Sequence, residues 1–219
     1  MSMIQACIFD LDGVIVDTAK YHFTAWRRMA NELGFDFTEK ENEELKGVSR
    51  MKSLEMILEW GGIKGLSEER KIALATQKNE WYKEFIANMN PSEILPGVVA
   101  FIQHLQNQNI KIAIGSASRN TVPVLTAVGL IDRFGSIIDG NKTVNPKPHP
   151  EVFLKGAAEL GAVPAHTVVF EDAPKGVDAA NTGGFYSVGV GSPENLGHAN
   201  FVISDFEGLT LDQLEKQLA

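Results

Sequence analysis

The sequence contains a single cysteine, Cys7, among its 219 residues, so it cannot form an internal disulfide. Cys7 lies in an apolar run, which is typical of a buried, inert thiol. No apolar segment approaches the ~20 residues needed to cross a bilayer, and the N-terminus has no basic segment followed by a signal-type apolar core. These absences predict a soluble, cytoplasmic protein without disulfides and without a membrane partner.

The sequence also lacks an excess of positive charge. Its 20 Lys and Arg against 28 Asp and Glu give a net charge of −8, and the cations are scattered along the chain. Nucleic acid is therefore not expected as a partner. An anionic phosphate ligand would need a few local cations and a metal ion to overcome the overall negative field. No segment indicates an obligate interface, so we expect a monomer.

Short apolar runs bounded by Gly, Pro, Asp or Ser predict buried strands, and helical patterns lie between them. The predicted strands are Ala6–Leu11, Ile110–Ile114, Thr167–Phe170, Tyr186–Val190 and Phe201–Ile203. The apolar faces of the predicted helices are Val98, Phe101, Ile102 and Leu105; Val122, Leu125 and Val128; and Val152, Phe153, Ala157 and Leu160. This alternation predicts an α/β fold in which helices cover both faces of a mostly parallel sheet.

Between about Thr18 and Asn90 the pattern changes to several helices with no convincing strand. Thr38 and Glu41 are spaced as a capping box, and Ser67 gives a second, weaker helix start. A proline-containing segment after Asn90 returns the chain to the sheet. The sequence thus predicts an all-helical cap inserted after the first strand, with the cap at 17–91 and the core at 1–16 and 92–219.

Two carboxylates, Asp10 and Asp12, lie at the end of the first predicted strand. Ligands of open α/β sheets bind at the carboxyl ends of the strands, so both side chains are placed where a site belongs. Carboxylates crowded together repel each other unless they share a cation or a proton. One can stay ionised as a nucleophile while the other holds a proton for a leaving oxygen. The pattern by itself leaves open which aspartate attacks.

Three further segments, each expected at a strand end, could serve such a pair. Gly115–Asn120 combines small residues, hydroxyls and free backbone N–H groups that suit phosphate oxygens. Lys147 stands between two prolines, whose rigidity can aim its charge. Glu171 and Asp172 end a buried strand and are hard oxygen ligands of the type that magnesium prefers.

Each of these features also has a purely structural explanation. Aspartates form turns at strand ends, Ser and Asn cap helices, and a lysine between prolines can simply belong to a surface loop. The four segments together, in this order and at strand ends, favour a catalytic site.

Four short motifs resemble those of the haloacid dehalogenase superfamily. They are Asp10-Leu11-Asp12-Gly13, Ser116, Lys147 and Glu171-Asp172, and the resemblance covers essentially the whole chain. It implies a Rossmann-like core and an aspartyl-phosphate intermediate at Asp10. It also implies that Asp12 is the general acid and base, and that Ser116 and Lys147 hold the transferring phosphoryl group. The implied Mg²⁺ site consists of Asp10, Asp12, Glu171 and Asp172.

Two segments of the predicted cap resemble the β-phosphoglucomutase branch of that superfamily. They are Tyr21–Trp26, a helical segment, and Leu45–Arg50, a glycine-broken loop with two cations. The resemblance implies that Arg50 binds a nontransferring phosphate and that Lys46 and His22 contact the sugar or Asp12. The implied substrate-binding residues are Leu11, Thr18, His22, Trp26, Lys46, Gly47, Val48, Ser49, Arg50, Ala117, Ser118, Arg119 and Asn120. The alternatives are that both cations end helices at the surface, and that His22 and Trp26 only pack within the cap.

This resemblance implies a Mg²⁺-dependent phosphomutase acting on sugar phosphates. The expected reaction interconverts β-glucose 1-phosphate and glucose 6-phosphate through enzyme-bound β-glucose 1,6-bisphosphate. One alternative is a sugar-phosphate phosphatase that uses the same chemistry at Asp10. Another is a sugar-phosphate-binding regulator without catalytic activity, against which the intact acidic and basic motif residues argue.

Overall fold

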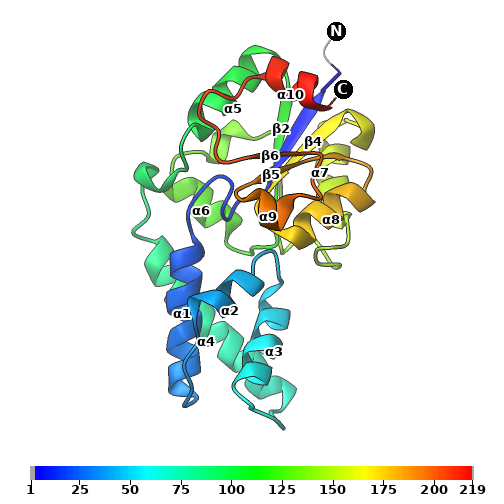
Figure 1. The fold of residues 1–219 in the computed structure, drawn as a ribbon. Helices are drawn as coiled ribbons and strands as arrows, with labels where there is room; N and C mark the ends of the chain where they lie inside the picture. The colour runs from blue at the N-terminus through cyan, green and yellow to red at the C-terminus, as the bar shows by residue number, and fades with distance from the viewer. Residues whose placement is uncertain (1–2, 219) are drawn as a thin grey trace.

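The computed structural model describes residues 3–218, whose strands form one parallel sheet (Figure 1). The strands are β1 (Ala6–Phe9), β2 (Lys111–Gly115), β3 (Ser136–Ile138), β4 (Thr167–Glu171), β5 (Tyr186–Val190) and β6 (Phe201–Ile203). Their order across the sheet is β3-β2-β1-β4-β5-β6, and every neighbouring pair is parallel. The direction of strand order changes between β1 and β4, which is where ligands bind in such sheets.

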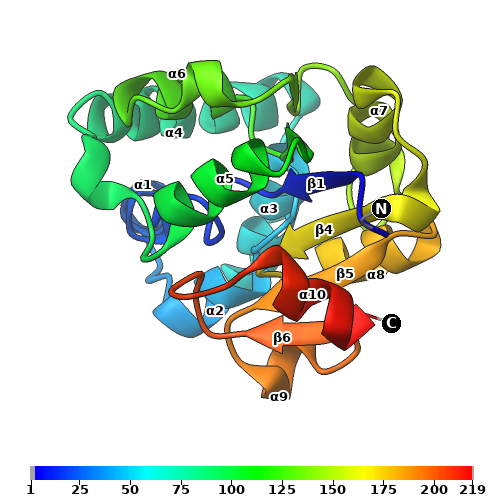
Figure 2. The same cartoon turned by 90° about the horizontal axis from the view of Figure 1, so that it is seen from above.

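Helices cover both faces of this sheet (Figure 2). Cys7 and Phe9 point into an apolar cluster with the first group of helices, whereas Ala6 and Ile8 point into a second cluster on the other face. This follows from the alternation of side chains along a strand. The first group is α5 (Val98–Asn107), α6 (Thr121–Ala127) and α10 (Leu211–Leu218), and the second is α7 (Glu151–Leu160) and α8 (Pro174–Thr182). The predicted α/β fold is confirmed.

An aromatic cluster fixes the two central strands against each other. The rings of Phe9 on β1 and Phe170 on β4 are stacked with centroids 4.8 Å apart. Phe101 from α5 and Phe206 pack against both rings, with centroid distances between 5.3 and 6.3 Å. The residues that follow Phe9 and Phe170 are therefore held side by side.

The first four helices after β1 lie beyond one end of the sheet (Figure 1). They are α1 (Ala19–Glu32), α2 (Glu39–Glu44), α3 (Arg50–Trp60) and α4 (Glu68–Ile86). We call these four helices and their connections the cap. The Thr38–Glu41 capping box is confirmed, and Ser67 accepts a hydrogen bond from the backbone N–H of Arg70 at 3.3 Å. The cap boundaries at 17–91 stay a prediction.

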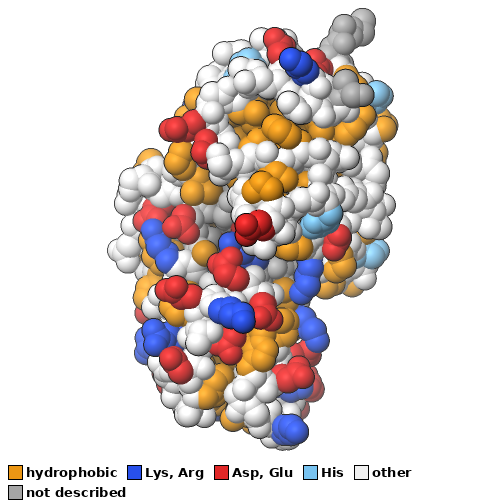
Figure 3. Space-filling view, in the orientation of Figure 1, with side chains coloured by type: hydrophobic (Ala, Val, Ile, Leu, Met, Phe, Trp, Pro, Cys, Tyr) orange, Lys and Arg blue, Asp and Glu red, His pale blue; other side chains and the backbone are white. Residues whose placement is uncertain are grey.

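Acidic and basic side chains gather over the cap in the view of Figure 3, with the two signs interspersed. The short elements elsewhere are the helix α9 (Pro193–Leu196) and the 3-10 turns η1 (Pro91–Glu93), η2 (Ile131–Arg133) and η3 (Pro164–His166). None of the helices within residues 3–218 has the length and apolar character needed to cross a membrane.

Several predicted details are wrong. The first strand ends at Phe9, because the carbonyl of Leu11 accepts hydrogen bonds from Ile15 and Val16 in a turn. The three-residue strand β3 was too short to be predicted from periodicity. Val122 is 45% exposed, and α6 buries Val124 in its place.

The prediction that Lys147 lies at a strand end is also wrong. Its segment belongs to the long loop between β3 and α7, so this lysine reaches the sheet edge from a connection. Its position depends on how that loop is held.

Candidate active site

The carboxyl ends of the central strands bring the predicted catalytic residues together. Asp10 follows β1, Ser116 follows β2, and Glu171 is the last residue of β4. Parallel register pairs Phe9 with Ile114 on one side and with Phe170 on the other. Strand pairing alone therefore gathers side chains that are more than a hundred residues apart in sequence.

Lys147 is the buried cation at this edge. Its Nζ donates to Oδ1 of Asp10 at 2.5 Å and to Oε1 of Glu171. The lysine side chain is only 1% exposed. Burial alone would lower the pKa of Lys147, but the two carboxylates outweigh it and raise that pKa above its ordinary value. Lys147 therefore stays protonated beside Asp10.

Glu171 is held by the protein on both oxygens. Oε1 accepts from Lys147, and Oε2 accepts from the backbone N–H of Ala173 at 2.9 Å. A Cβ at Gly176 would lie 2.0 Å from Oε1, so only glycine at the start of α8 leaves room for this carboxylate. Burial raises the pKa of Glu171 to about 7 against the opposing effect of Lys147. The geometry makes Glu171 a support for Lys147.

Asp172, the next residue after Glu171, provides a second carboxylate, and its side chain is 9% exposed. Its pKa is raised well above the ordinary value by burial and then by the charges of Glu171 and Asp10. Lys46 from the cap lies 3.5 Å from Oδ2. A Cβ at Gly13 would lie 2.2 Å from the same oxygen, so Gly13 leaves space for it.

A magnesium ion suits this donor set. The carboxylates of Asp10 and Asp172 and the backbone carbonyl of Asp12 are hard oxygen donors of the kind that magnesium prefers. The mutual effect of the carboxylates on the pKa of Asp172 indicates an excess of buried negative charge that a cation would relieve. Within residues 3–218, no three or more His, Cys, Asp or Glu side chains are gathered as a metal centre. The four-residue metal set, which includes Glu171, stays a prediction.

Asp12 is set up to titrate near neutral pH. Burial, followed by the charge of Asp10, raises its pKa to about 6. The hydroxyl of the fully buried Thr18 opposes this shift by donating to Oδ1 of Asp12. A carboxyl group with a pKa close to the working pH is suited to both giving and taking a proton.

The segment after β2 forms a tight series of serine turns. The N–H of Ser118 donates to Oγ of the buried Ser116 at 3.0 Å, and the N–H of Asn120 donates to Oγ of Ser118 at 3.2 Å. The Asn120 side chain does not cap α6 but donates to Oδ1 of Asn79 on cap helix α4 at 2.9 Å. This buried amide pair joins the cap to the core.

The cap contributes a second buried cation, Lys78, that the sequence analysis missed. Its Nζ lies 2.9 Å from Nδ1 of His22 and 4.4 Å from the centre of the Trp26 ring. Burial lowers the pKa of Lys78 well below its ordinary value, and Arg50 adds to this. The available signal was its place on the apolar face of α4, one turn from Leu74 and from Tyr82.

The cap loop 46–50 closes over the core edge. Gly47 has a φ of +68°, and a Cβ there would come within 3.2 Å of Ala173 on the core. Ser49 begins α3 as its N-cap without a capping hydrogen bond from its side chain. Burial and then the charge of Arg119 lower the pKa of Arg50. Two arginines, one from the cap and one from the core, thus repel each other across this opening.

Other predicted substrate-binding residues differ in what they offer a ligand. Leu11 is fully buried in the main apolar cluster, and Trp26 is 3% exposed, so both side chains pack within the protein. Val48, Ala117 and Ser118 are half-buried along the two loops. Their roles toward a ligand stay predictions.

A family model for haloacid dehalogenase-like hydrolases matches residues 4–184. The chain belongs to this enzyme family. Asp10, Lys147 and Glu171, which contact one another in the structure, belong to the sequence motifs that resemble this family.

Among relatives in the haloacid dehalogenase-like family, a β-phosphoglucomutase of Bacillus subtilis is 40% identical over 215 residues, which cover 98% of this chain and 95% of the relative. A phosphorylated carbohydrates phosphatase of Thermotoga maritima is 31% identical over 183 residues, covering 83% and 82%. The crystal structure of a β-phosphoglucomutase from Clostridium difficile is similar with a TM-score of 0.94 and 44% identity, covering 98% and 97%. The resemblance to the β-phosphoglucomutase branch is thereby confirmed.

Proposed function

We propose that this protein is a Mg²⁺-dependent β-phosphoglucomutase. It interconverts β-D-glucose 1-phosphate and D-glucose 6-phosphate through a phosphorylated Asp10 and bound β-glucose 1,6-bisphosphate. The similarity to β-phosphoglucomutases over nearly the whole chain supports this function. Phosphorylated sugars are the only partner required, and a cytoplasmic, monomeric enzyme stays a prediction.

The similarity to β-phosphoglucomutases carries the proposal, and the charge around Arg50 is consistent with it. Burial and then the charge of Arg119 lower the pKa of Arg50, against an opposing effect of the Glu80 charge. Two guanidinium groups that influence each other's charge suit a phosphate, which can accept hydrogen bonds from both. This anion site is separate from the Lys147 site. A bisphosphorylated sugar fills both at once.

Asp10 is the nucleophile in this mechanism. An oxygen of its carboxylate forms a bond to phosphorus while the bond from phosphorus to the sugar oxygen breaks. Lys147 lies 2.5 Å from Oδ1 of Asp10 and neutralises charge on the phosphoryl oxygens as they approach. The N–H of Asp12 donates to Oδ2 at 3.0 Å and fixes the carboxylate orientation. Held by Asp10, Asp172 and the Asp12 carbonyl, Mg²⁺ would supply further charge neutralisation.

Asp12 moves the proton. It donates a proton to the sugar oxygen as that oxygen leaves, and it takes a proton from the other sugar hydroxyl when the phosphoryl group is transferred back. Its pKa of about 6 allows both tasks near neutral pH. Thr18, which adjoins the first cap helix, orients the carboxyl group, so cap closure and acid–base catalysis are coupled.

A sugar-phosphate phosphatase is the second candidate, because a phosphorylated carbohydrates phosphatase is also among the relatives at 31% identity. The two activities share the attack by Asp10 and differ in whether water or a sugar hydroxyl takes the phosphoryl group. The buried contact between Asn79 and Asn120 favours the mutase, because a closed cap excludes water.

The deciding experiment follows glucose 6-phosphate and inorganic phosphate together. β-Glucose 1-phosphate and Mg²⁺ are supplied with a trace of the 1,6-bisphosphate. We expect glucose 6-phosphate in large excess over inorganic phosphate. Release of phosphate equal to or above glucose 6-phosphate would establish the phosphatase, and absence of both products would establish a binding protein.

A further inference from the structure

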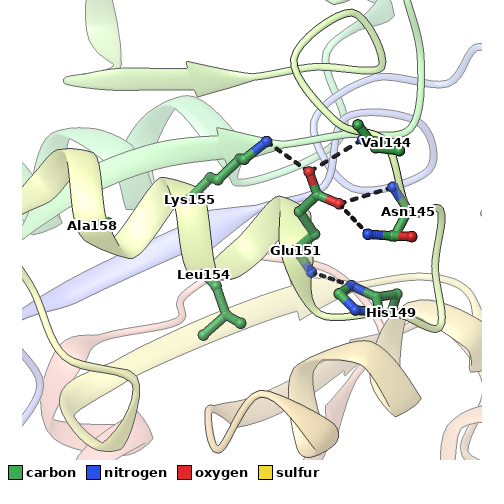
Figure 4. A pocket seen from close by; sticks show the side chains of 7 residues that line it. All are labelled: Val144, Asn145, His149, Glu151, Leu154, Lys155 and Ala158. Atoms are coloured by element: carbon green, nitrogen blue, oxygen red, sulfur yellow. Dashed lines mark hydrogen bonds and ion pairs between the residues drawn. The ribbon is translucent and has the colours of Figure 1, made fainter.

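Glu151, the first residue of α7, binds the loop that carries Lys147 (Figure 4). Its Oε2 accepts from the backbone N–H of Asn145 at 2.8 Å and from the side-chain amide of Asn145 at 2.9 Å. Its Oε1 accepts from the N–H of Val144 at 3.1 Å and from Nζ of Lys155 at 2.6 Å. Four donors thus converge on one carboxylate.

The loop has little else to hold it at this point. Val144 is 86% exposed, so its side chain gives the loop no apolar anchor. The Glu151 side chain is only 13% exposed, because the loop folds over it. Further local contacts also close this turn: His149 donates its N–H to the Pro146 carbonyl at 3.0 Å, Glu151 donates its N–H to Nδ1 of His149 at 3.2 Å, and Lys155 donates to the Lys142 carbonyl at 2.7 Å.

The contacts of Glu151 differ from those of an ordinary acidic residue at a helix start. Such a residue interacts with the N–H groups of its own helix. Glu151 instead accepts from N–H groups six and seven residues earlier in the chain. Lys155, with Asn145 and Val144, lowers its pKa to about 2, so the carboxylate stays charged at neutral pH.

We infer that Glu151 is a positioning residue for phosphoryl transfer: by clamping residues 144–145 it fixes the loop that carries Lys147, so that the ammonium group reaches Asp10 and Glu171. Lys147 is 1% exposed and contacts both carboxylates, so a small displacement of its ammonium group would break these contacts. Displacement of a positioned charge by about 1 Å can lower the rate about 100-fold. The inference rests on the proposed role of Asp10 and Lys147, whichever acceptor takes the phosphoryl group.

The test compares Glu151→Ala and Glu151→Gln with the control Lys155→Met. Lys155→Met removes one donor to Glu151 and the hydrogen bond from Lys155 to the Lys142 carbonyl, but it leaves both backbone contacts of the clamp. We expect Glu151→Ala to lower kcat by about 10- to 100-fold with KM changed less than about threefold, because the charge that acts during transfer is misplaced. Glu151→Gln keeps one acceptor oxygen and should lie between wild type and Ala. Lys155→Met should stay within about twofold of wild type.

A double-mutant cycle with Lys147→Ala separates positioning from general destabilisation. If Glu151 acts through Lys147, adding Glu151→Ala to Lys147→Ala changes the residual turnover less than about twofold. An equal loss of turnover in both backgrounds, or wild-type kcat in Glu151→Ala, overturns the inference. Should Glu151→Ala fail to fold, Asn145→Ala removes one contact of the clamp and should lower kcat in the same direction by a smaller factor.

Turnover in every variant is measured as the sum of glucose 6-phosphate and inorganic phosphate. The ratio of these products in the wild-type protein tests the mutase function, whereas the dependence of their sum on Glu151 tests the clamp. If the protein proves to be a phosphatase whose turnover depends strongly on Glu151, the mutase function is refuted and the clamp is supported. If it proves to be a mutase whose turnover does not depend on Glu151, the mutase function is supported and the clamp is refuted.

Discussion

The core side and the cap side of the active site treat buried cations in opposite ways. On the core side, Lys147 contacts Asp10 and Glu171, and its pKa is raised. On the cap side, Lys78 contacts His22 and aromatic rings, Arg50 is influenced by the charge of Arg119, and both pKa values are lowered. On the core side, the paired charges hold the carboxylate of Asp10, the proposed nucleophile, in place before any ligand binds. We therefore expect an anionic ligand to be bound on the cap side, where its charge would relieve the repulsion between these cations.

The largest effect is expected from replacing Asp10, the proposed nucleophile on the core side. Asp10→Asn keeps the side-chain shape but cannot form the acyl phosphate, so turnover should fall by about 10⁴-fold or more. The coupled assay measures this loss, and the circular dichroism spectrum checks that the variant folds. Near-normal activity of the purified variant would refute covalent catalysis at Asp10. Trapping of wild type, but not the variant, with beryllium fluoride would identify the site.

The next effect concerns the cap cation Arg50. Arg50→Ala should lower kcat/KM for glucose 6-phosphate formation by about 100-fold, because a desolvated phosphate contact is lost. Phosphate release should fall less, since Asp10 and Lys147 are untouched. The matched control is Arg28→Ala, which removes an exposed cap cation that lies over the Trp81 ring. An equal loss in both variants would show that Arg50 only stabilises the cap.

A smaller effect appears in the pH profile of Thr18→Val. The Thr18 hydroxyl donates to the ionised form of Asp12 and so opposes the rise of its pKa to about 6. Loss of this donor raises the pKa of Asp12 further, so the limb of the kcat/KM profile that Asp12 governs should move to higher pH by about one unit. Thr24→Val is the control, because Thr24 bonds only to the Lys20 carbonyl on the same helix. An unmoved limb would show that Thr18 does not tune Asp12.

The smallest effect is on stability. Lys78→Met should stabilise the unliganded protein by about 1 kcal/mol, or about 2–4 °C in Tm, because it removes an amine whose charged form is disfavoured by burial and by Arg50. A lysine with a lowered folded pKa costs stability below that pKa and regains it as the pH rises toward 10.5, so the gain should be largest at low pH. Thermal unfolding at several pH values measures this gain. A lower Tm for the variant would show that Lys78 is satisfied without a ligand.

Most of the fold could be predicted because the buried strands are continuous apolar runs and the cap has none. β5 and β6 occur at the predicted bounds, and the α7 apolar face Val152, Phe153, Ala157 and Leu160 is buried. The three residues of β3 could not be recognised, since periodicity needs a longer window. Val122 was misplaced because a helix of seven residues leaves its apolar face ambiguous.

The sequence alone determined the identities of the residues at the strand ends, because each motif is contiguous: Asp10 with Asp12, Ser116 with its loop, and Glu171 with Asp172. The tertiary structure decided which of them touch. It placed Lys147 between Asp10 and Glu171, brought Lys78 beside His22, and fixed the loop through Glu151. Contacts between residues far apart in the chain depend on strand register and helix packing, which local sequence patterns do not encode.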